Sequence, residues 1–159
     1  MNPKDGAAAL KAAAPPPARE RHSAPAVPNG RVTGGYVLKQ LVADGLLATA
    51  DAERFKISGR RDRAGHPLAN LAEMNYRTPN NERKLLDLEA LTQWLAQKSA
   101  LPYFHIDPLR VDFTRVVDVM SSSYATTYSI LPVAMTGEEV TIATCEPLQT
   151  GWHREIEQI

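Results

Sequence analysis

Two short apolar segments near the carboxyl end of the chain constrain its fold more than any other feature. Residues 130–135 are Ile-Leu-Pro-Val-Ala-Met and residues 140–145 are Val-Thr-Ile-Ala-Thr-Cys. The residues between them include Gly137, which suits a tight connection between antiparallel strands. A short helix is predicted over about residues 112–119, ahead of the first strand. The region therefore predicts a small β-sheet with short helices packed on it.

The preceding region has apolar residues at helical spacing and predicts four helices. The first begins near residues 34–35 and is closed by Gly45, because glycine readily adopts the left-handed conformation of a Schellman motif. The other three begin, by capping or fixed φ, at Thr49, Pro67 and Asp87. Residues 75–84 are polar and predict a loop. The fold class is thus α+β, a small helical lobe followed by a second lobe with short helices packed on a small β-sheet.

Composition divides the chain into four segments. Residues 1–33 are rich in proline and alanine, with few large apolar side chains, and predict a disordered tail. Residues 34–100 form the helical lobe and residues 101–150 the α/β lobe. Residues 151–159 predict the start of a further helix.

Net charge and hydropathy narrow the setting. Eighteen basic and eighteen acidic residues balance, so charge gives no reason to expect a nucleic acid or an anionic membrane as partner. No stretch reaches the roughly 18 apolar residues that a membrane-spanning helix needs. Cys145, the single cysteine, is interpreted as a small core residue in a reducing compartment. These features predict a cytoplasmic chain without direct membrane insertion.

Residue patterns that carry catalysis are missing from the sequence. There is no Gly-rich loop ending in Gly-Lys-Ser/Thr, which would be needed to hold nucleotide phosphates. The four histidines match no metal-ligand spacing. Ser121, Ser122 and Ser123 lie outside a nucleophile elbow and are predicted to cap a helix. The sequence therefore predicts no enzyme activity, no metal and no cofactor.

Three features of the carboxyl-terminal half carry a resemblance to a known family. They are Leu101-Pro102 ahead of a short helix, Ala125 and Tyr128 before the strand that begins Ile130-Leu131-Pro132-Val133, and a second strand that ends in Glu146-Pro147. Together they resemble the amino-terminal domain of the traffic ATPases of type II secretion and type IV pilus assembly, the general secretion pathway protein E family.

The resemblance implies a noncatalytic docking domain. It would link the ATPase motor to the cytoplasmic part of an inner-membrane platform protein, and the full-length form would be hexameric. The chain would then be cytoplasmic and peripheral to the inner membrane through that partner. Residues 151–159 would begin a linker helix toward an ATPase core that lies further along the chain. Contribution to hexamer packing is an alternative role.

Some members of the resembled family bind cyclic di-GMP through two tandem motifs that open with Arg-Leu-Gly and continue through apolar pairs to a glycine. Here the outline of both motifs remains, but Tyr36 and His66 replace the arginines, which could pair with phosphate. The candidate ligand positions that the resemblance implies are Tyr36, Leu41, Gly45, His66 and Leu71. A cyclic di-GMP sensor is therefore the first alternative to the docking domain, ahead of the role in hexamer packing.

A candidate partner surface is predicted in the helical lobe. Phe55 would supply an apolar anchor, and the basic turn that follows it would steer an acidic partner. The residues of this surface are Phe55, Arg60, Arg61 and Arg63. Residues 101–147 are expected to form a stable scaffold with little exposed apolar surface.

Overall fold

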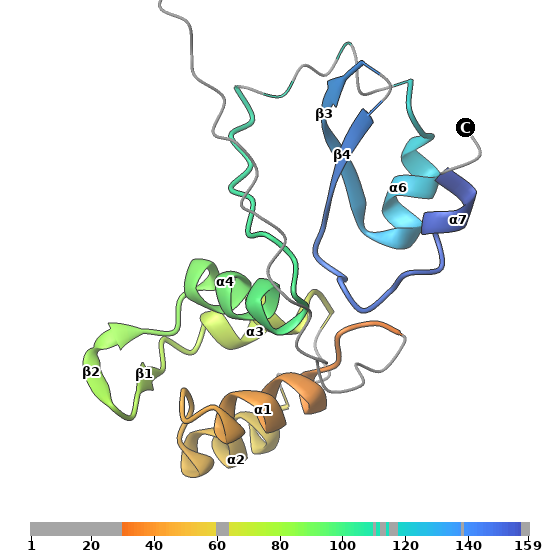
Figure 1. The fold of residues 1–159 in the computed structure, drawn as a ribbon. Coiled ribbons are helices and arrows are strands. Elements are labelled where there is room, and N and C mark those ends of the chain that lie inside the picture. Colours follow the sequence, from red (N-terminus) through yellow and green to blue (C-terminus); the bar gives the residue numbers. More distant parts are fainter. Residues whose placement is uncertain are drawn as a thin grey trace, which may run out of the picture.

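The computed structural model describes residues 30–59, 64–109, 111, 114, 118–137 and 139–156. These residues form six helices and two separate two-stranded antiparallel sheets, which confirms the α+β class (Figure 1). In chain order the elements are α1 (Gly34–Ala43), α2 (Thr49–Ile57), α3 (Pro67–Ala72), β1 (Arg77–Thr78), β2 (Asn81–Leu85), α4 (Leu88–Lys98), α6 (Ser122–Tyr128), β3 (Ile130–Thr136), β4 (Glu139–Thr144) and α7 (His153–Ile156). The tail expected over residues 1–29 and most of the helix expected over residues 112–119 lie outside the described residues.

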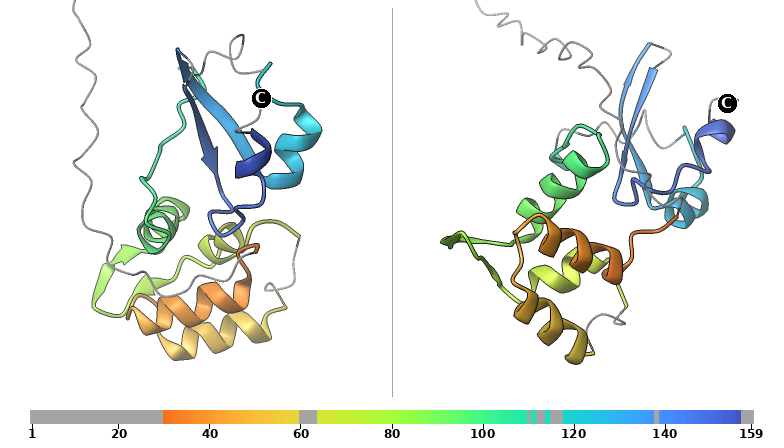
Figure 2. Two further views of the ribbon diagram at one scale, coloured as in Figure 1. Left: turned by 45° about the vertical axis from the view of Figure 1, so that its right-hand side comes forward. Right: turned by 60° about the horizontal axis from the view of Figure 1, so that its bottom comes forward.

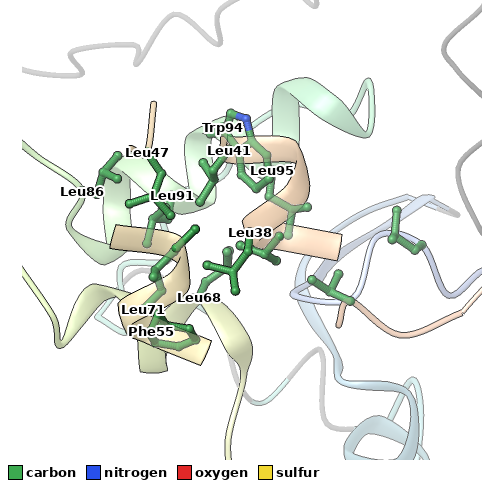
Figure 3. Packing of buried hydrophobic residues seen from close by; sticks show 14 residues of the cluster. Leu38, Leu41, Leu47, Phe55, Leu68, Leu71, Leu86, Leu91, Trp94 and Leu95 are labelled. Carbon is green, nitrogen blue, oxygen red and sulfur yellow. The ribbon is translucent and has the colours of Figure 1, made fainter. Parts of the chain in front are cut away.

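Helices α1 to α4 enclose the main core of the described structure. Leucines dominate it, and Figure 3 shows Leu41, Leu91 and Leu95 meeting the side chain of Trp94. Leu41 and Leu91 are fully buried. The positions buried on α1 are Val37, Leu38 and Leu41, the i, i+1, i+4 face that helical periodicity predicts. We call residues 30–100 the helical part.

The helix boundaries largely follow the capping signals in the sequence. Gly45, at φ 68°, closes α1, and the Leu46 amide donates to the Leu41 carbonyl at 2.9 Å, as in a Schellman motif. Pro67 begins α3, and the Asp87 carboxylate accepts a hydrogen bond from the Ala90 amide at 2.8 Å. These three predictions are confirmed.

Two predictions in the helical part are wrong. The helix α2 does begin at Thr49, as predicted, but Thr49 does not cap it: the cap position belongs to Ala48, whose side chain has no oxygen to offer. Residues 75–84 are mostly a β-hairpin, formed by β1 and β2, where a loop was predicted. The Leu86 amide donates to the Tyr76 carbonyl at 2.8 Å and closes this hairpin at its open end. Backbone pairing therefore forms here without an apolar alternation to signal it.

The second pair of strands occupies the carboxyl-terminal part of the chain. β3 and β4 pair along their length, from Ile130 opposite Thr144 to Thr136 opposite Glu139, with an irregularity between Pro132 and Ala134. In both views of Figure 2, α6 and α7 lie to one side of this hairpin, and the extended segment that leaves α4 runs on the other side. We call residues 118–156 the hairpin part and residues 101–109 the connector.

Cys145 is exposed, so the prediction of a core cysteine is wrong. It lies just after β4, where the chain turns away from the sheet. Although the residue as a whole is exposed, its thiol group is partly buried. This burial, followed by the charge of Glu146, raises the pKa of Cys145. Among the described residues, no helix has both the length and the apolar content to cross a membrane.

Candidate functional site

The two helices that open the tandem motifs occupy equivalent places in the helical part. α1 and α3 contact each other, and Leu41 and Leu71, thirty residues apart, are both buried in the same core. Gly45 after α1 and Asn75 after α3 both have left-handed backbones, with φ of 68° and 52°. The tandem pattern in the sequence is thus a repeat of helix and left-handed turn in the structure.

Of the five candidate ligand positions, Tyr36 and His66 have polar side chains, and both lie near helix starts, although the Nε2 atom of His66 is buried. Tyr36 lies in the first turn of α1 and packs partly on the core. His66 caps α3, where its Nδ1 accepts a hydrogen bond from the Leu68 amide at 3.3 Å. Since Nδ1 accepts, the neutral ring carries its proton on Nε2. Leu41 and Leu71 fill the core, and Gly45 forms the turn that ends α1.

Glu146 lies beside His66, and the sequence analysis did not foresee it as a site residue. Its Oε1 is 3.9 Å from His66 Nε2, and its Oε2 accepts a hydrogen bond from the Val32 amide at 2.6 Å. The Glu146 residue is 7% exposed. A carboxylate is rarely buried to this degree unless it is hydrogen-bonded. Its position joins the loop after β4 to the start of α3 and to the chain before α1.

The segment before α1, residues 30–33, makes further contacts with the hairpin part. The Gly30 amide donates to the Leu148 carbonyl at 3.0 Å, and the Arg31 guanidinium donates to the Thr127 carbonyl at 3.1 Å. Leu148 is buried and belongs to the core cluster of the helical part, together with Val32. We call residues 30–33 the arm. The arm and the loop after β4 therefore form the junction between the two parts.

The predicted partner surface is only partly testable in the described residues. Phe55 is 1% exposed and packs in the core, so it cannot serve as an exposed anchor, and that prediction is wrong. The periodicity of α2 directs Phe55 inward with Ala52, whereas Ile57 at the end of the helix is exposed. Arg60, Arg61 and Arg63 lie outside the described residues.

The connector carries exposed apolar side chains. The most exposed is Leu109, at 95%, and the others are Leu101, Phe104 and Ile106. Tyr103, by contrast, turns back to α4: burial, then the charge and hydrogen bond of Glu89, raise its pKa. The expectation that residues 101–147 expose little apolar surface is therefore wrong. The backbone here runs between two packed units and has no sheet partner to cover its side chains.

An ion-paired cluster fastens the end of α1 to α4. The Asp44 carboxylate accepts hydrogen bonds from Trp94 Nε1 and from Lys98 Nζ, each at 2.7 Å. Burial alone would raise the pKa of Asp44, but these two donors and the charge of Lys98 outweigh it and lower the pKa. Within the described residues no group of three His, Cys, Asp or Glu side chains could hold a metal ion. We call Asp44, Trp94 and Lys98 the clamp, because their contacts join the end of α1 to α4.

Comparison with known proteins agrees with the resemblance seen in the sequence. Residues 99–159 match the MshEN domain. The chain is 32% identical over 124 residues to the type IV pilus assembly ATPase TfpB of Acinetobacter baylyi, an alignment that covers 77% of this chain and 21% of that protein. The chain thus spans about a fifth of the length of the curated relative that it matches. Both findings confirm the predicted similarity to the amino-terminal domain of the traffic ATPases.

Proposed function

We propose, from the similarity to the amino-terminal region of a pilus assembly ATPase, that this chain is a noncatalytic docking domain of a secretion or pilus ATPase. Its partner would be the cytoplasmic part of an inner-membrane platform protein of a type II secretion or related system. In this proposal the chain works on the cytoplasmic side, the motor to which it is joined is hexameric, and catalysis is carried out elsewhere in the assembly.

The observation that carries the proposal is the exposed apolar surface of the connector. The described residues contain nine exposed large hydrophobic side chains, and four of them lie on the connector: Leu101, Phe104, Ile106 and Leu109. Two more, Leu131 and Met135, lie on β3. Single exposed apolar side chains are ordinary on a protein surface. A concentration of them on one stretch of chain is typical of a surface that binds another protein.

The connector is suited to this role because its start is anchored on α4. It leaves α4, where Tyr103 contacts Glu89, and it leads into the hairpin part. Apolar side chains on a backbone that is already ordered lose less conformational entropy on binding than those on a free chain. Phe104 is the aromatic member of the group and the natural anchor for a partner pocket.

The test is binding to the platform protein's purified cytoplasmic domain, measured by biolayer interferometry. The double variant Phe104→Ser/Leu109→Ser is expected to weaken binding by at least about tenfold, since truncated interface anchors cost on the order of 2 kcal/mol. Ile57→Ser is the matched control, because Ile57 is equally apolar and 84% exposed but lies on α2. Circular dichroism should be unchanged in both.

Reversal of Arg60, Arg61 and Arg63 to Glu forms the second arm of this experiment. If these arginines steer an acidic partner, reversal should slow association, most strongly at low salt. If the connector variant binds normally but the Ile57 control or the Arg variant loses binding, the interface lies on the helical part. Unchanged binding in all three variants would refute the docking surface, and loss of the full-length hexamer in the connector variant would favour the packing role.

A further inference from the structure

The junction between the helical part and the hairpin part depends on one buried carboxylate. Glu146 is 114 residues from Val32 in the sequence, yet its Oε2 lies 2.6 Å from the Val32 amide nitrogen. A hydrogen bond from a backbone amide to a carboxylate is charge-assisted and stronger than one between neutral groups. The contact between Glu146 and Val32 spans more of the sequence than the 96 residues that separate Arg31 from Thr127 in another side-chain hydrogen bond between the arm and the hairpin part.

We infer that Glu146 is a latch that holds the arm and the start of α3 against the loop after β4, and so fixes the hairpin part on the helical part. The inference goes beyond the proposed docking function and does not depend on it. It assigns a positioning role to Glu146, whose carboxylate touches both the arm, through Val32, and the cap of α3, through His66.

The choice of a charged residue at this place supports a contact that can open. Burial of a carboxylate removes favourable hydration, and a well-packed apolar side chain would often stabilise the fold more. The compensation here is one short hydrogen bond and an imidazole at 3.9 Å, and His66 Nε2 itself has no hydrogen-bond partner within the described structure. Water can replace both interactions once the junction separates. The latch therefore fixes the closed arrangement while adding little to its total stability.

The contacts around Glu146 define what the latch controls. The Gly30 amide bonds to the Leu148 carbonyl and the Arg31 guanidinium bonds to the Thr127 carbonyl, so both depend on the same approach of arm and hairpin part. Leu148 enters the core cluster of the helical part next to this carboxylate. Release of Glu146 should free the arm first and leave the core of α1 to α4 in place.

Hydrogen exchange of individual amides, followed by NMR on the whole chain, tests the latch. In Glu146→Ala the protection of the Val32 and Gly30 amides should fall about tenfold or more, the equivalent of one charge-assisted hydrogen bond. Amides of α4, such as those of Leu91 and Leu95, should keep their protection. Glu146→Gln keeps an oxygen that can accept a hydrogen bond from the Val32 amide. The loss of protection at Val32 should therefore be smaller in this variant than in Glu146→Ala. Glu139→Ala is the matched control, an exposed carboxylate on β4 of the same part.

Each outcome decides the inference. Selective loss of protection in the arm supports it. Unchanged protection of Val32 in Glu146→Ala overturns it, and so does an equal loss in Glu139→Ala. If every amide of α1 to α4 loses protection together, Glu146 is an ordinary core group and the latch is refuted. If Glu146→Ala does not fold, the same criteria apply to Glu146→Gln. A loss of protection confined to the arm would then support the inference. None of these outcomes depends on a platform partner.

Discussion

The helical part and the hairpin part use their apolar side chains in opposite ways. Thirteen of the fourteen residues of the core cluster lie between Val32 and Leu95, and the fourteenth is Leu148 from the hairpin part. The hairpin part buries few large side chains of its own, chiefly Ile130, Val133 and Trp152, and Leu131 and Met135 on β3 stay exposed. The helical part thus holds most of the buried apolar area, while the connector and hairpin part present apolar area to the surroundings.

This division teaches where stability and recognition reside in the molecule. Burial of apolar area is the dominant favourable contribution to folding, so the free energy of unfolding should depend chiefly on the helical part. Exposed apolar area contributes nothing to folding but is available for binding. The sequence suggested the reverse assignment, a stable carboxyl-terminal scaffold and a binding surface on the helices, and the burial of Phe55 and exposure of Phe104 argue against it.

The largest expected effect comes from a cavity in the helical core. Leu41→Ala removes a side chain with 0% exposure and should lower the free energy of unfolding by about 3 kcal/mol, within the range for buried leucines. Leu109→Ala, at 95% exposure, should change it by less than about 0.5 kcal/mol. Urea unfolding followed by circular dichroism measures both.

The same pair of variants should show the opposite order in binding to the platform domain. Leu109→Ala should weaken binding, and Leu41→Ala should bind normally at temperatures where it stays folded. A large loss of stability in Leu109→Ala would show that the connector is part of the fold's core, and the contrast between the two regions would then fail.

The sequence predicted well those features that a few neighbouring residues determine. Gly45 closes α1 because glycine has no Cβ to oppose φ of 68°, and Asp87 caps α4 because its short side chain reaches the Ala90 amide. The strands around Gly137 were also predicted, since their apolar runs and the turn glycine lie within sixteen residues. Local chemistry sufficed for each.

Features set by distant parts of the chain were missed. β1 and β2 are polar strands, so their pairing left no apolar alternation to find. Glu146 looked like an ordinary acidic residue at a strand end, because its partner Val32 is 114 residues away. The connector was predicted as an extended segment of a lobe with little exposed apolar surface, and the sequence could not show that its apolar side chains would stay exposed.

A smaller effect on the free energy of unfolding is expected from the clamp, which adds to the stability of the helical part. Asp44→Asn removes the charge that accepts from Trp94 Nε1 and Lys98 Nζ. The side chain of Asp44 is about a quarter exposed, so solvent screening reduces the loss to about 1 kcal/mol. Urea unfolding at neutral pH measures it, with Asp51→Asn, whose partner Arg54 is exposed on α2, as the matched control.

The difference in free energy of unfolding between the parent chain and Asp44→Asn depends on pH, because the pKa of Asp44 is lowered in the folded state. A carboxyl group with a lower pKa in the folded state stabilises the fold above the unfolded pKa of about 3.9, and that contribution is lost as pH falls through the folded value. The stability gap between the parent chain and Asp44→Asn should therefore be full at pH 6 to 7 and shrink below about pH 4. A gap that is constant down to the folded pKa would show that the clamp acts through hydrogen bonding without the charge.

The smallest effect on stability is expected at the polar contact between α6 and α7. The Tyr124 hydroxyl on α6 donates to Glu155 Oε2 on α7 at 2.8 Å. Burial of the hydroxyl, followed by the hydrogen bond and charge of Glu155, raises the pKa of Tyr124 to about 12. Because the folded pKa is raised, the stabilisation is complete below the unfolded pKa of about 10 and is lost as pH rises toward 12.

Ultraviolet titration of the phenols should show one late group that disappears in Tyr124→Phe. In Glu155→Gln the same group should titrate earlier, though still above 10, because burial is the larger cause. A Glu155→Gln titration that superimposes on that of the parent chain would mean that α7 is not docked on α6, and the hairpin part would then be looser still than its burial suggests.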